Sequence, residues 1–339
     1  MPGENMNWIP ELSGVVRAVR ASVLLAALLV VPFSGASLAQ DAWPSRPVRV
    51  VVPSSPGGGT DIYARLIAAA LGESLNQQFV IDNRPGGAGN IGTEIVVRAA
   101  PDGYTLLVSS SASVIINPAL FHNLPWNVER DLVPVSAGVR SPMVFCVHPS
   151  SPMRTVADLI AAARKEPGTV SYGSAGIGTT TSMGVRMLEE RAGVRFLHVP
   201  YKGVGPASQA LIGAQIQFLL PDLPAVIAQI KGGKLRAIAL TDPVPQLPGV
   251  PTMEEQGYPN FEVAASFSVM APAGTSQSIV RKANAEIARA MKSPSIAQKL
   301  EALSLIPVFE SPEEYAARLT RVRAMWADFV KRNQITADQ

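Results

Sequence analysis

The chain has 339 residues, of which 47% are hydrophobic and 16% charged. This composition excludes an intrinsically disordered chain and is sufficient for two domains of ordinary size. The 29 basic and 26 acidic residues leave a formal net charge of +3 and form no long basic run or arginine and aromatic stripe. We therefore expect no nucleic-acid partner.

Residues 1–39 have the pattern of a secretory signal peptide. Arg17 and Arg20 precede an apolar run over residues 21–31, and small residues stand at the cleavage positions before Ala39. We predict cleavage after Ala39, so that the mature chain is exported to the periplasm. Either Met1 or Met6 is compatible with the start of the chain.

No other uncharged stretch approaches the roughly 20 residues that a membrane helix requires. The chain has one cysteine, Cys146, so we expect no intramolecular disulfide. No apolar repeat indicates a coiled-coil partner, and we expect a monomer.

After the signal segment, runs rich in β-branched residues alternate with stretches of helical pattern. In chain order these are a strand at 48–52, a helix at 63–75, a strand at 79–82, a helix at 92–99 and a strand at 105–109. Such alternation is typical of parallel βαβ units.

A second series of the same kind follows. It comprises strands at 144–148, 170–172, 196–199, 216–219 and 235–240, with helices at 156–164, 182–191 and 206–212 between them. Thr155 is expected to cap the first of these helices. Two similar α/β halves are therefore predicted.

The C-terminal part is predicted to return to the first half. Residues 241–260 are rich in Pro and Gly and indicate a connecting loop. A strand at 267–270 then precedes amphipathic helices at 277–291 and 312–332, which we expect to pack on the first half.

The first glycine loop, residues 53–61, lies between the first strand and the first long helix and reads PSSPGGGTD. Its small residues let backbone N–H groups approach a ligand closely. A helix N-terminus carries unsatisfied N–H donors and a partial positive charge, which favour an anion. Asp61 is expected to act as a cap or to hold water rather than to contact an anion.

The second glycine loop, residues 173–181, also follows a strand and precedes a helix. Two anion-binding loops would then face each other across a cleft. Neither loop contains Arg or Lys, so we expect a carboxylate held by neutral N–H and hydroxyl donors, directly or through water. The alternative is that both loops are ordinary strand-to-helix turns.

The third glycine loop, residues 84–92, matches G-x-G-x-x-G through Gly87, Gly89 and Gly92. A dinucleotide site would require an acidic residue about 20 positions further on, and none stands there. We therefore expect no dinucleotide and no other cofactor.

Catalytic and metal patterns are weak throughout. No G-x-S-x-G motif occurs, and His122, His148 and His198 stand in unrelated contexts. Cys146 and His148 give two potential ligands, short of the three or four of a zinc site. We expect no catalytic residue and no metal, with Cys146 on a buried strand.

Short motifs recur in a fixed order along the chain. They are WPSRPVR at 43–49, PGGGTD at 56–61, NRPG at 83–86, APDGYTL at 100–106, VPYKG at 199–203, GKLRA at 233–237, VPT at 250–252 and APAGT at 271–275. Together they resemble the Bug family of tripartite tricarboxylate transporter receptors, from residue 43 to the last helix.

The resemblance implies a type II periplasmic-binding-protein fold, in which two α/β lobes joined by two crossings enclose a ligand cleft. The lobes would be residues 42–142 plus 263–339, and 143–262. It implies a solute-binding receptor, not an enzyme, that captures a small carboxylate by lobe closure and delivers it to the large and small membrane permease subunits. A ligand sensor acting on a membrane kinase, or an exported hydrolase, are the alternatives.

The resemblance also implies the ligand-binding positions. They are Pro53, Ser54, Ser55, Gly57, Gly58, Thr60, Asp61, Ser109, Ser113, Ser174, Gly176, Gly178, Thr179, Thr180, Lys202 and Asp222. The chain departs from the family where Ser54 replaces a usual Phe, Ser182-Met183 a usual His-Leu, and Arg186 a usual Glu. We expect Ser54 to leave a wider or more polar pocket.

Overall fold

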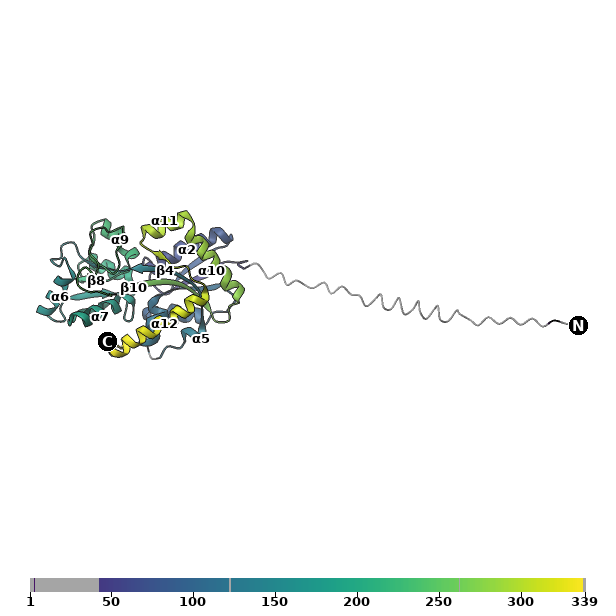
Figure 1. Ribbon diagram of the computed structural model, residues 1–339, viewed down its shortest axis with the longest axis horizontal. Coiled ribbons are helices and arrows are strands. Elements are labelled where there is room, and N and C mark those ends of the chain that lie inside the picture. The colour runs from purple at the N-terminus through teal and green to yellow at the C-terminus, as the bar shows by residue number, and fades with distance from the viewer. Residues whose placement is uncertain (1–2, 4–42, 122, 262, 338–339) are drawn as a thin grey trace. The chain divides into compact units, whose positions relative to one another are not determined.

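The computed structural model describes residues 3, 43–121, 123–261 and 263–337. Apart from residue 3, the predicted signal peptide lies outside these residues. None of the described helices is both long enough and apolar enough to span a membrane. From residue 43 onward, the chain builds two β-sheets with helices packed against them (Figure 1).

The first sheet has six strands in the order β11-β4-β10-β3-β1-β2. Their bounds are β1 Val48–Val52, β2 Phe79–Asn83, β3 Thr105–Ser110, β4 Leu132–Pro142, β10 Ala264–Pro272 and β11 Ile306–Pro307. Strand β1 pairs in parallel with β2 and β3, whereas β10 runs antiparallel to both β3 and β4. The predicted βαβ pattern is therefore confirmed for β1, β2 and β3.

The second sheet has five strands in the order β7-β6-β8-β5-β9. Their bounds are β5 Val144–Val147, β6 Ser171–Ser174, β7 Leu197–Pro200, β8 Phe218–Leu219 and β9 Arg236–Leu240. Strand β6 is parallel to β7 and β8, and β5 is antiparallel to β8 and β9.

The chain passes between the sheets twice. It leaves the first sheet at the end of β4 and enters the second at β5, then returns from β9 to β10, as predicted for residues 267–270. In Figure 1, β4 and β10 run between the helices of the two sheets. Both β5 and β10 follow a crossing and are antiparallel to strands of the sheet that they join, so both sheets are mixed rather than purely parallel.

Helices connect these strands, and all seven that the sequence predicted are present, together with short helices and α9 and α11, which were not predicted. They are α2 Gly59–Leu75, η1 Gly87–Gly89, α3 Asn90–Val97, η2 Ala112–Ile116, α4 Asn117–Leu120, α5 Val128–Asp131, α6 Val156–Lys165, α7 Thr180–Ala192, α8 Val204–Ile212, α9 Leu223–Lys231, α10 Gln277–Lys292, α11 Pro294–Ala302 and α12 Pro312–Arg332. Thr155 caps α6 as expected, in a capping box with Asp158.

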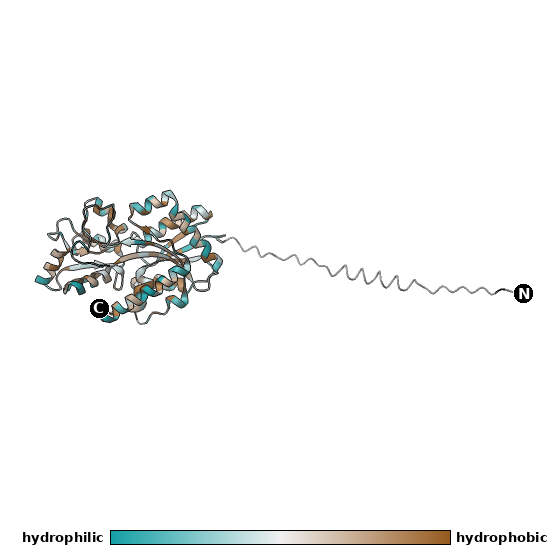
Figure 2. Cartoon of the chain, viewed as in Figure 1, coloured by the Kyte–Doolittle hydropathy of each residue, from teal (hydrophilic) through white to brown (hydrophobic). Residues whose placement is uncertain are grey.

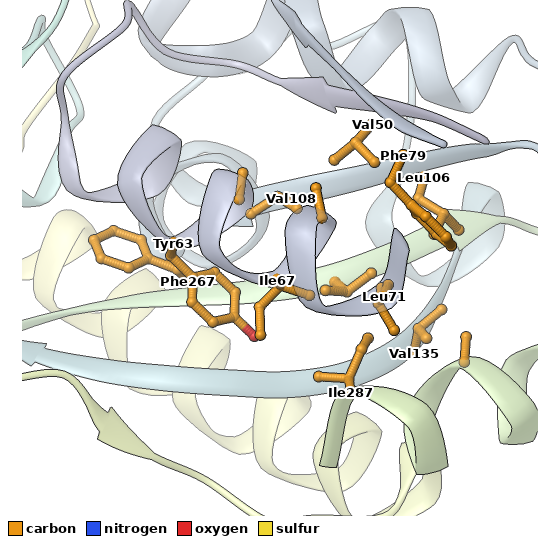
Figure 3. Packing of buried hydrophobic residues seen from close by; sticks show 14 of the residues in the cluster. Val50, Tyr63, Ile67, Leu71, Phe79, Leu106, Val108, Val135, Phe267 and Ile287 are labelled. Atoms are coloured by element: carbon orange, nitrogen blue, oxygen red, sulfur yellow. The ribbon is translucent and has the colours of Figure 1, made fainter. Parts of the chain in front are cut away.

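Helix α2 shows how the first sheet is covered. Tyr63, Ile67 and Leu71 recur every fourth residue, so they form one apolar stripe. Figure 3 shows this stripe lying over the sheet next to Val108 and Phe267, and all five side chains are buried. Each fully buried side chain of this size contributes about 1.5–3 kcal/mol. In Figure 2 the helices carry both hydrophobic and hydrophilic residues, as expected for elements with one buried face.

Strand β4 contains a bulge where it pairs with β10. The register shifts between Phe267 and Val269, and Gly138 adopts a φ of 65° opposite this shift. A Cβ at Gly138 would overlap the carbonyl oxygen of Phe267. The bulge therefore requires glycine both for its backbone conformation and for the close approach of β10.

We predict that Gly138→Ala destabilises the protein by more than about 3 kcal/mol, because positive φ strain of about 1 kcal/mol adds to a backbone overlap. Gly168→Ala is the matched control, since Gly168 has a φ of 74° with no atom within 4 Å of the added Cβ. The control should lose only about 1 kcal/mol. Urea denaturation measures both losses, and equal losses would contradict the proposed overlap.

Candidate functional site

A cavity of about 300 Å³ lies where several strands of both sheets end. Parallel α/β sheets bind ligands at the carboxyl ends of their strands, and the residues that follow β1, β2, β6 and β7 all line this cavity. Of the predicted site residues, those lining it are Pro53, Ser54, Gly58, Thr60, Gly176, Thr179, Thr180, Lys202 and Asp222.

Four helices begin at this cavity. Its lining includes Gly59 of α2, Thr180 of α7, Val204 of α8 and Asp222, which directly precedes α9. The first N–H groups of a helix have no partner within the helix and carry a partial positive charge. The cavity is therefore surrounded by backbone donors suited to an anion.

Asp61 holds the first glycine loop rather than lining the cavity. Its Oδ2 accepts hydrogen bonds from Gly57 N and Arg65 Nε, both at 3.0 Å, and its Oδ1 accepts one from Asn83 Nδ2 at 2.9 Å. Burial would raise the pKa of Asp61, but the bonds from Arg65, Gly57 and Asn83 outweigh it and hold the pKa below its ordinary value. These contacts agree with the expectation that Asp61 is not an anion contact.

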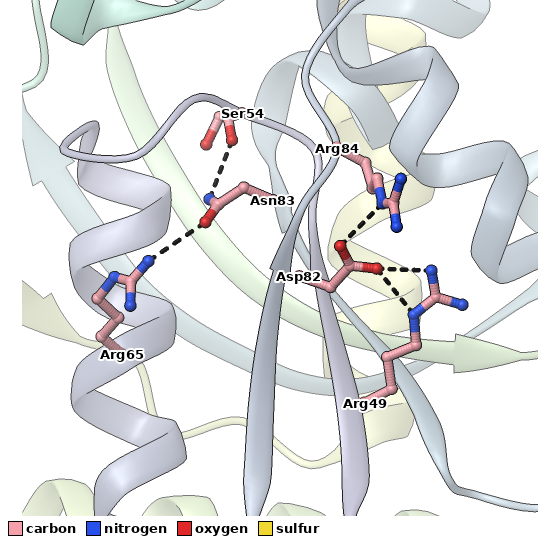
Figure 4. Close-up of polar contacts among 6 residues, drawn as sticks. All are labelled: Arg49, Ser54, Arg65, Asp82, Asn83 and Arg84. Atoms are coloured by element: carbon pink, nitrogen blue, oxygen red, sulfur yellow. Dashed lines mark hydrogen bonds and ion pairs between the residues drawn. The ribbon is translucent and has the colours of Figure 1, made fainter.

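Asn83 joins the end of β2 to the same loop (Figure 4). Its Nδ2 donates to the carbonyl oxygen of Ser54 at 3.1 Å, and its Oδ1 accepts from Arg65 at 3.2 Å. Next to it, Asp82 binds Arg49 and Arg84 on the other face of the strand. The first glycine loop is thus fixed by side chains of residues that are not among those lining the cavity.

The Ser54 hydroxyl faces a different environment. Ser54 lines the cavity, and its Oγ is buried without a hydrogen-bond partner among the described residues. The Oγ of Ser55 shares this property but lies against the loop before α8, where a Cβ at Gly203 would overlap it. A buried polar group without a partner is costly, so a partner that reached the Ser54 hydroxyl would stabilise the protein.

Within the second glycine loop, two of three threonines are engaged locally. Thr179 Oγ1 donates to the carbonyl oxygen of Gly176 at 2.6 Å, and Thr181 Oγ1 accepts from the Ala175 N–H at 2.9 Å. Thr180 Oγ1 makes only a long contact of 3.4 Å with Ser111 Oγ among the described residues. Thr180 is therefore the hydroxyl of this loop that is best placed to bind a ligand.

The remaining predicted site residues do not line the cavity. Ser109 Oγ lies 2.8 Å from Ser268 Oγ between neighbouring strands, and Ser113 Oγ donates to the carbonyl oxygen of Ser110. A Cβ at Gly178 would lie 2.5 Å from the Leu120 side chain. Together with Ser55, Gly57 and Asp61, these residues support the loops and strand ends around the cavity.

Ser174 is also behind the cavity wall, in contact with a histidine. Its Oγ lies 2.6 Å from His198 Nε2, and the side chain is fully buried. Burial, and then the positive charge of Arg186, lower the pKa of His198 to about 4, so the imidazole is neutral at pH 7. Because Ser174 is buried and does not line the cavity, this pair is not placed to attack a bound substrate.

Part of the cavity wall was not predicted. The third glycine loop contributes Pro85 through Gly89, and the first sheet contributes the aromatic ring of Phe267. The sequence signal in the third loop is its run of small residues, which also matches the dinucleotide motif. Phe267 comes from β10, which meets the cavity only after folding.

Asp222 and Lys202 are the charged side chains among the residues that line the cavity. Lys202 is exposed, whereas Asp222 is only 5% exposed and its Oδ2 has no hydrogen-bond partner among the described residues. Burial raises the pKa of Asp222 to about 6, although the N–H groups of Asp222 itself, Gly59 and Ala225 favour its charged form. Asp222 is therefore largely ionised at neutral pH.

Comparison with known proteins gives consistent matches. The family described as "Tripartite tricarboxylate transporter family receptor" matches residues 63–333. BugT of Bordetella pertussis is 36% identical over 299 residues, covering 87% of this chain and 92% of BugT.

Two solved structures of similar proteins carry ligands. The structure of an R. palustris protein with adipate has a TM-score of 0.83 at 34% identity, covering 87% of this chain and 99% of that one. MatC of Rhodopseudomonas palustris with bound malate has a TM-score of 0.81 at 30% identity, covering 85% and 100%. These likenesses confirm the predicted α/β binding-protein fold, with two lobes joined by two crossings.

We predict that Asp222→Asn stabilises the ligand-free protein at pH 7.5. The folded pKa of about 6 lies above the ordinary value of 3.8, so stability is present below about pH 4 and is lost as pH rises through about 6. About two pKa units correspond to about 3 kcal/mol at most. Urea denaturation should give the mutant a larger free energy of unfolding than the parent at pH 7.5, and the difference should be smaller near pH 4. A difference that does not vary with pH would contradict this account.

Proposed function

The chain belongs to the family of tripartite tricarboxylate transporter receptors, and we propose that it binds a small carboxylate in this cavity and delivers it to a membrane transporter. The observation that supports the proposal most strongly is the position of α2 and α7. These helices come from different sheets, and their first residues line one cavity. Neutral N–H and hydroxyl donors from both sides would hold the carboxylate.

The similar structures support a small acid as ligand, because one contains adipate and the other contains malate. The size of the cavity agrees, since about 300 Å³ is at the lower end of the range for small-molecule sites. No bond is made or broken in this proposal. Recognition and release would be the whole activity.

We propose that binding closes two lobes, residues 42–142 plus 263–339 and residues 143–262. The two crossings, β4 to β5 and β9 to β10, would act as the hinge. Arg140 on β4 and Asp242 after β9 form an ion pair of 2.8 Å beside these crossings. Closure would sequester the ligand between the starts of α2 and α7.

The cellular setting is part of the same proposal. The signal peptide would be removed after Ala39, and the mature receptor would act in the periplasm as a monomer. Its partners would be the large and small membrane subunits of the transporter, which would accept the ligand from the closed form.

We predict that Thr180→Asp weakens carboxylate binding by roughly 100- to 1,000-fold, because the new charge would occupy the α7 N-terminus and repel the ligand. Two unit charges about 4 Å apart interact by roughly 4 kcal/mol at an effective dielectric of 20, and each 1.4 kcal/mol is about tenfold. Thr180→Asn is the control of equal shape without charge and should lose less than about tenfold. Calorimetry with each carboxylate that binds the parent measures both.

Thr180→Asp should lose ligand affinity without losing folding stability, because an acid near a helix N-terminus is favourable by about 0.3–1 kcal/mol. Melting curves of the ligand-free proteins separate the two effects. If Thr180→Asp binds a carboxylate as tightly as Thr180→Asn does, the α7 N-terminus is not the carboxylate site.

A further inference from the structure

The C-terminal end of the described chain supplies one residue of the cavity wall. Ala337 is partly buried and lines the cavity, and the other lining residue nearest to it in sequence is Phe267, 70 positions earlier. Neither the glycine loops nor the recurring motifs include Ala337. Residues 333–337, which we call the C-terminal segment, therefore bring a separate piece of chain to the ligand cavity.

The end of α12 determines the course of this segment. Gln334 has a left-handed backbone with a φ of 49°, and its N–H donates to the carbonyl oxygen of Lys331 at 3.2 Å. The N–H of Ile335 donates to the carbonyl oxygen of Val330 at 3.1 Å. These two bonds are the pair that defines a Schellman motif, which ends a helix and turns the chain. The segment thus leaves α12 in a defined direction.

Apolar packing then holds the segment in place. Ile335 and Ala337 pack against one apolar cluster, to which α12 contributes Trp326 and Val330 and α7 contributes Met183. Residues of α7 and α12 also line one surface hollow together, and Figure 1 shows the end of α12 beside α7. The cluster thus joins the segment to α7, the helix whose first residue lines the ligand cavity.

The same segment lines a second, outer cavity of about 520 Å³. Asn333 and Ile335 contribute to the outer cavity, together with Arg186 and Glu189 of α7, whereas Ala337 contributes to the ligand cavity. Ile335 and Ala337 are two positions apart, so at most about 7 Å of chain separates the two linings. Open space therefore lies within one short span of chain from the ligand cavity.

We propose that the C-terminal segment sets the length of the acid that the cavity accepts, and that Ala337 is the residue that limits it. A ligand in a close-packed cavity gains affinity for each methylene that it buries and loses it where the wall blocks the chain. A larger side chain at Ala337 would shorten the cavity, and loss of the segment would lengthen it. This inference rests on the proposed function and adds a specificity-determining residue to it.

Three variants of the mature chain test the assignment. Ala337→Trp fills part of the cavity, and a chain that stops after Asn333 lacks this part of the wall. Thr336→Trp is the matched control, because Thr336 is partly buried in the same segment but does not line the cavity. Calorimetry measures the affinities for linear monocarboxylates from acetate to octanoate and linear dicarboxylates from oxalate to suberate.

The reference is the acid of these series that binds the parent most tightly. Ala337→Trp should weaken this acid by at least about tenfold and its shorter homologues by less, whereas Thr336→Trp should change it by less than about threefold. In the truncated chain, the next longer homologues should gain about fourfold over the reference acid for each methylene that the cavity newly buries.

A change in length preference is an outcome that a purely structural role of the segment would not produce. Melting curves of the ligand-free variants show which of them fold, and if the truncated chain does not, the two tryptophan variants decide. Equal affinities of Ala337→Trp and Thr336→Trp, or an unchanged length preference in a folded truncated chain, would overturn the inference while the carboxylate receptor stands. If no acid of either series binds the parent, the proposed function fails, and the inference with it.

Discussion

The N–H groups at the starts of four helices, which have no acceptor within their own helix, are the feature on which the site depends. Strands β1, β6 and β7 deliver α2, α7 and α8 to one cavity because each helix follows the carboxyl end of its strand. A helix cannot bond its own first N–H groups, so their partners must be side chains, water or a ligand. Under the proposed function, the small residues of the first and second glycine loops leave these donors accessible to an anion without an arginine or lysine in either of the two loops.

Beside the cavity, side-chain oxygens pack closely against two glycines. Gly59 and Gly203 both stand where an added Cβ would overlap a side-chain oxygen, that of Asp222 in one case and that of Ser55 in the other. The first contact brings an acid of the second sheet's half against a helix of the first. A buried carboxylate, that of Asp222, therefore stands among the helix N-termini that surround the cavity.

Much of the strand and helix order could be predicted from the sequence, because period-2 and period-3.6 patterns are local. Strand β4 was missed, since Pro134, Gly138 and Pro142 are usually breakers and its bulge is stabilised by pairing with β10. Helix α9 was missed because its first turn contains Pro224, which is tolerated at a helix start.

The site was predicted less completely than the fold. The first and second glycine loops carry a local signal, and both contribute to the cavity. The third glycine loop and Phe267 reach the same cavity through tertiary packing, which no local pattern encodes. Asp222 Oδ2 lies against Gly59, a residue 163 positions earlier in the chain, so the burial of this carboxylate could not be predicted from its sequence neighbours.

The central claim is that the cavity binds a carboxylate through helix N-termini. The most direct test is a melting-temperature screen of the mature protein against small carboxylic acids, each beside its carboxamide. The account predicts that at least one acid stabilises the protein, by about 2.7 kcal/mol at 100 times its dissociation constant, and that its amide does not. An acid and amide of equal effect, or no stabilising acid at all, would contradict it.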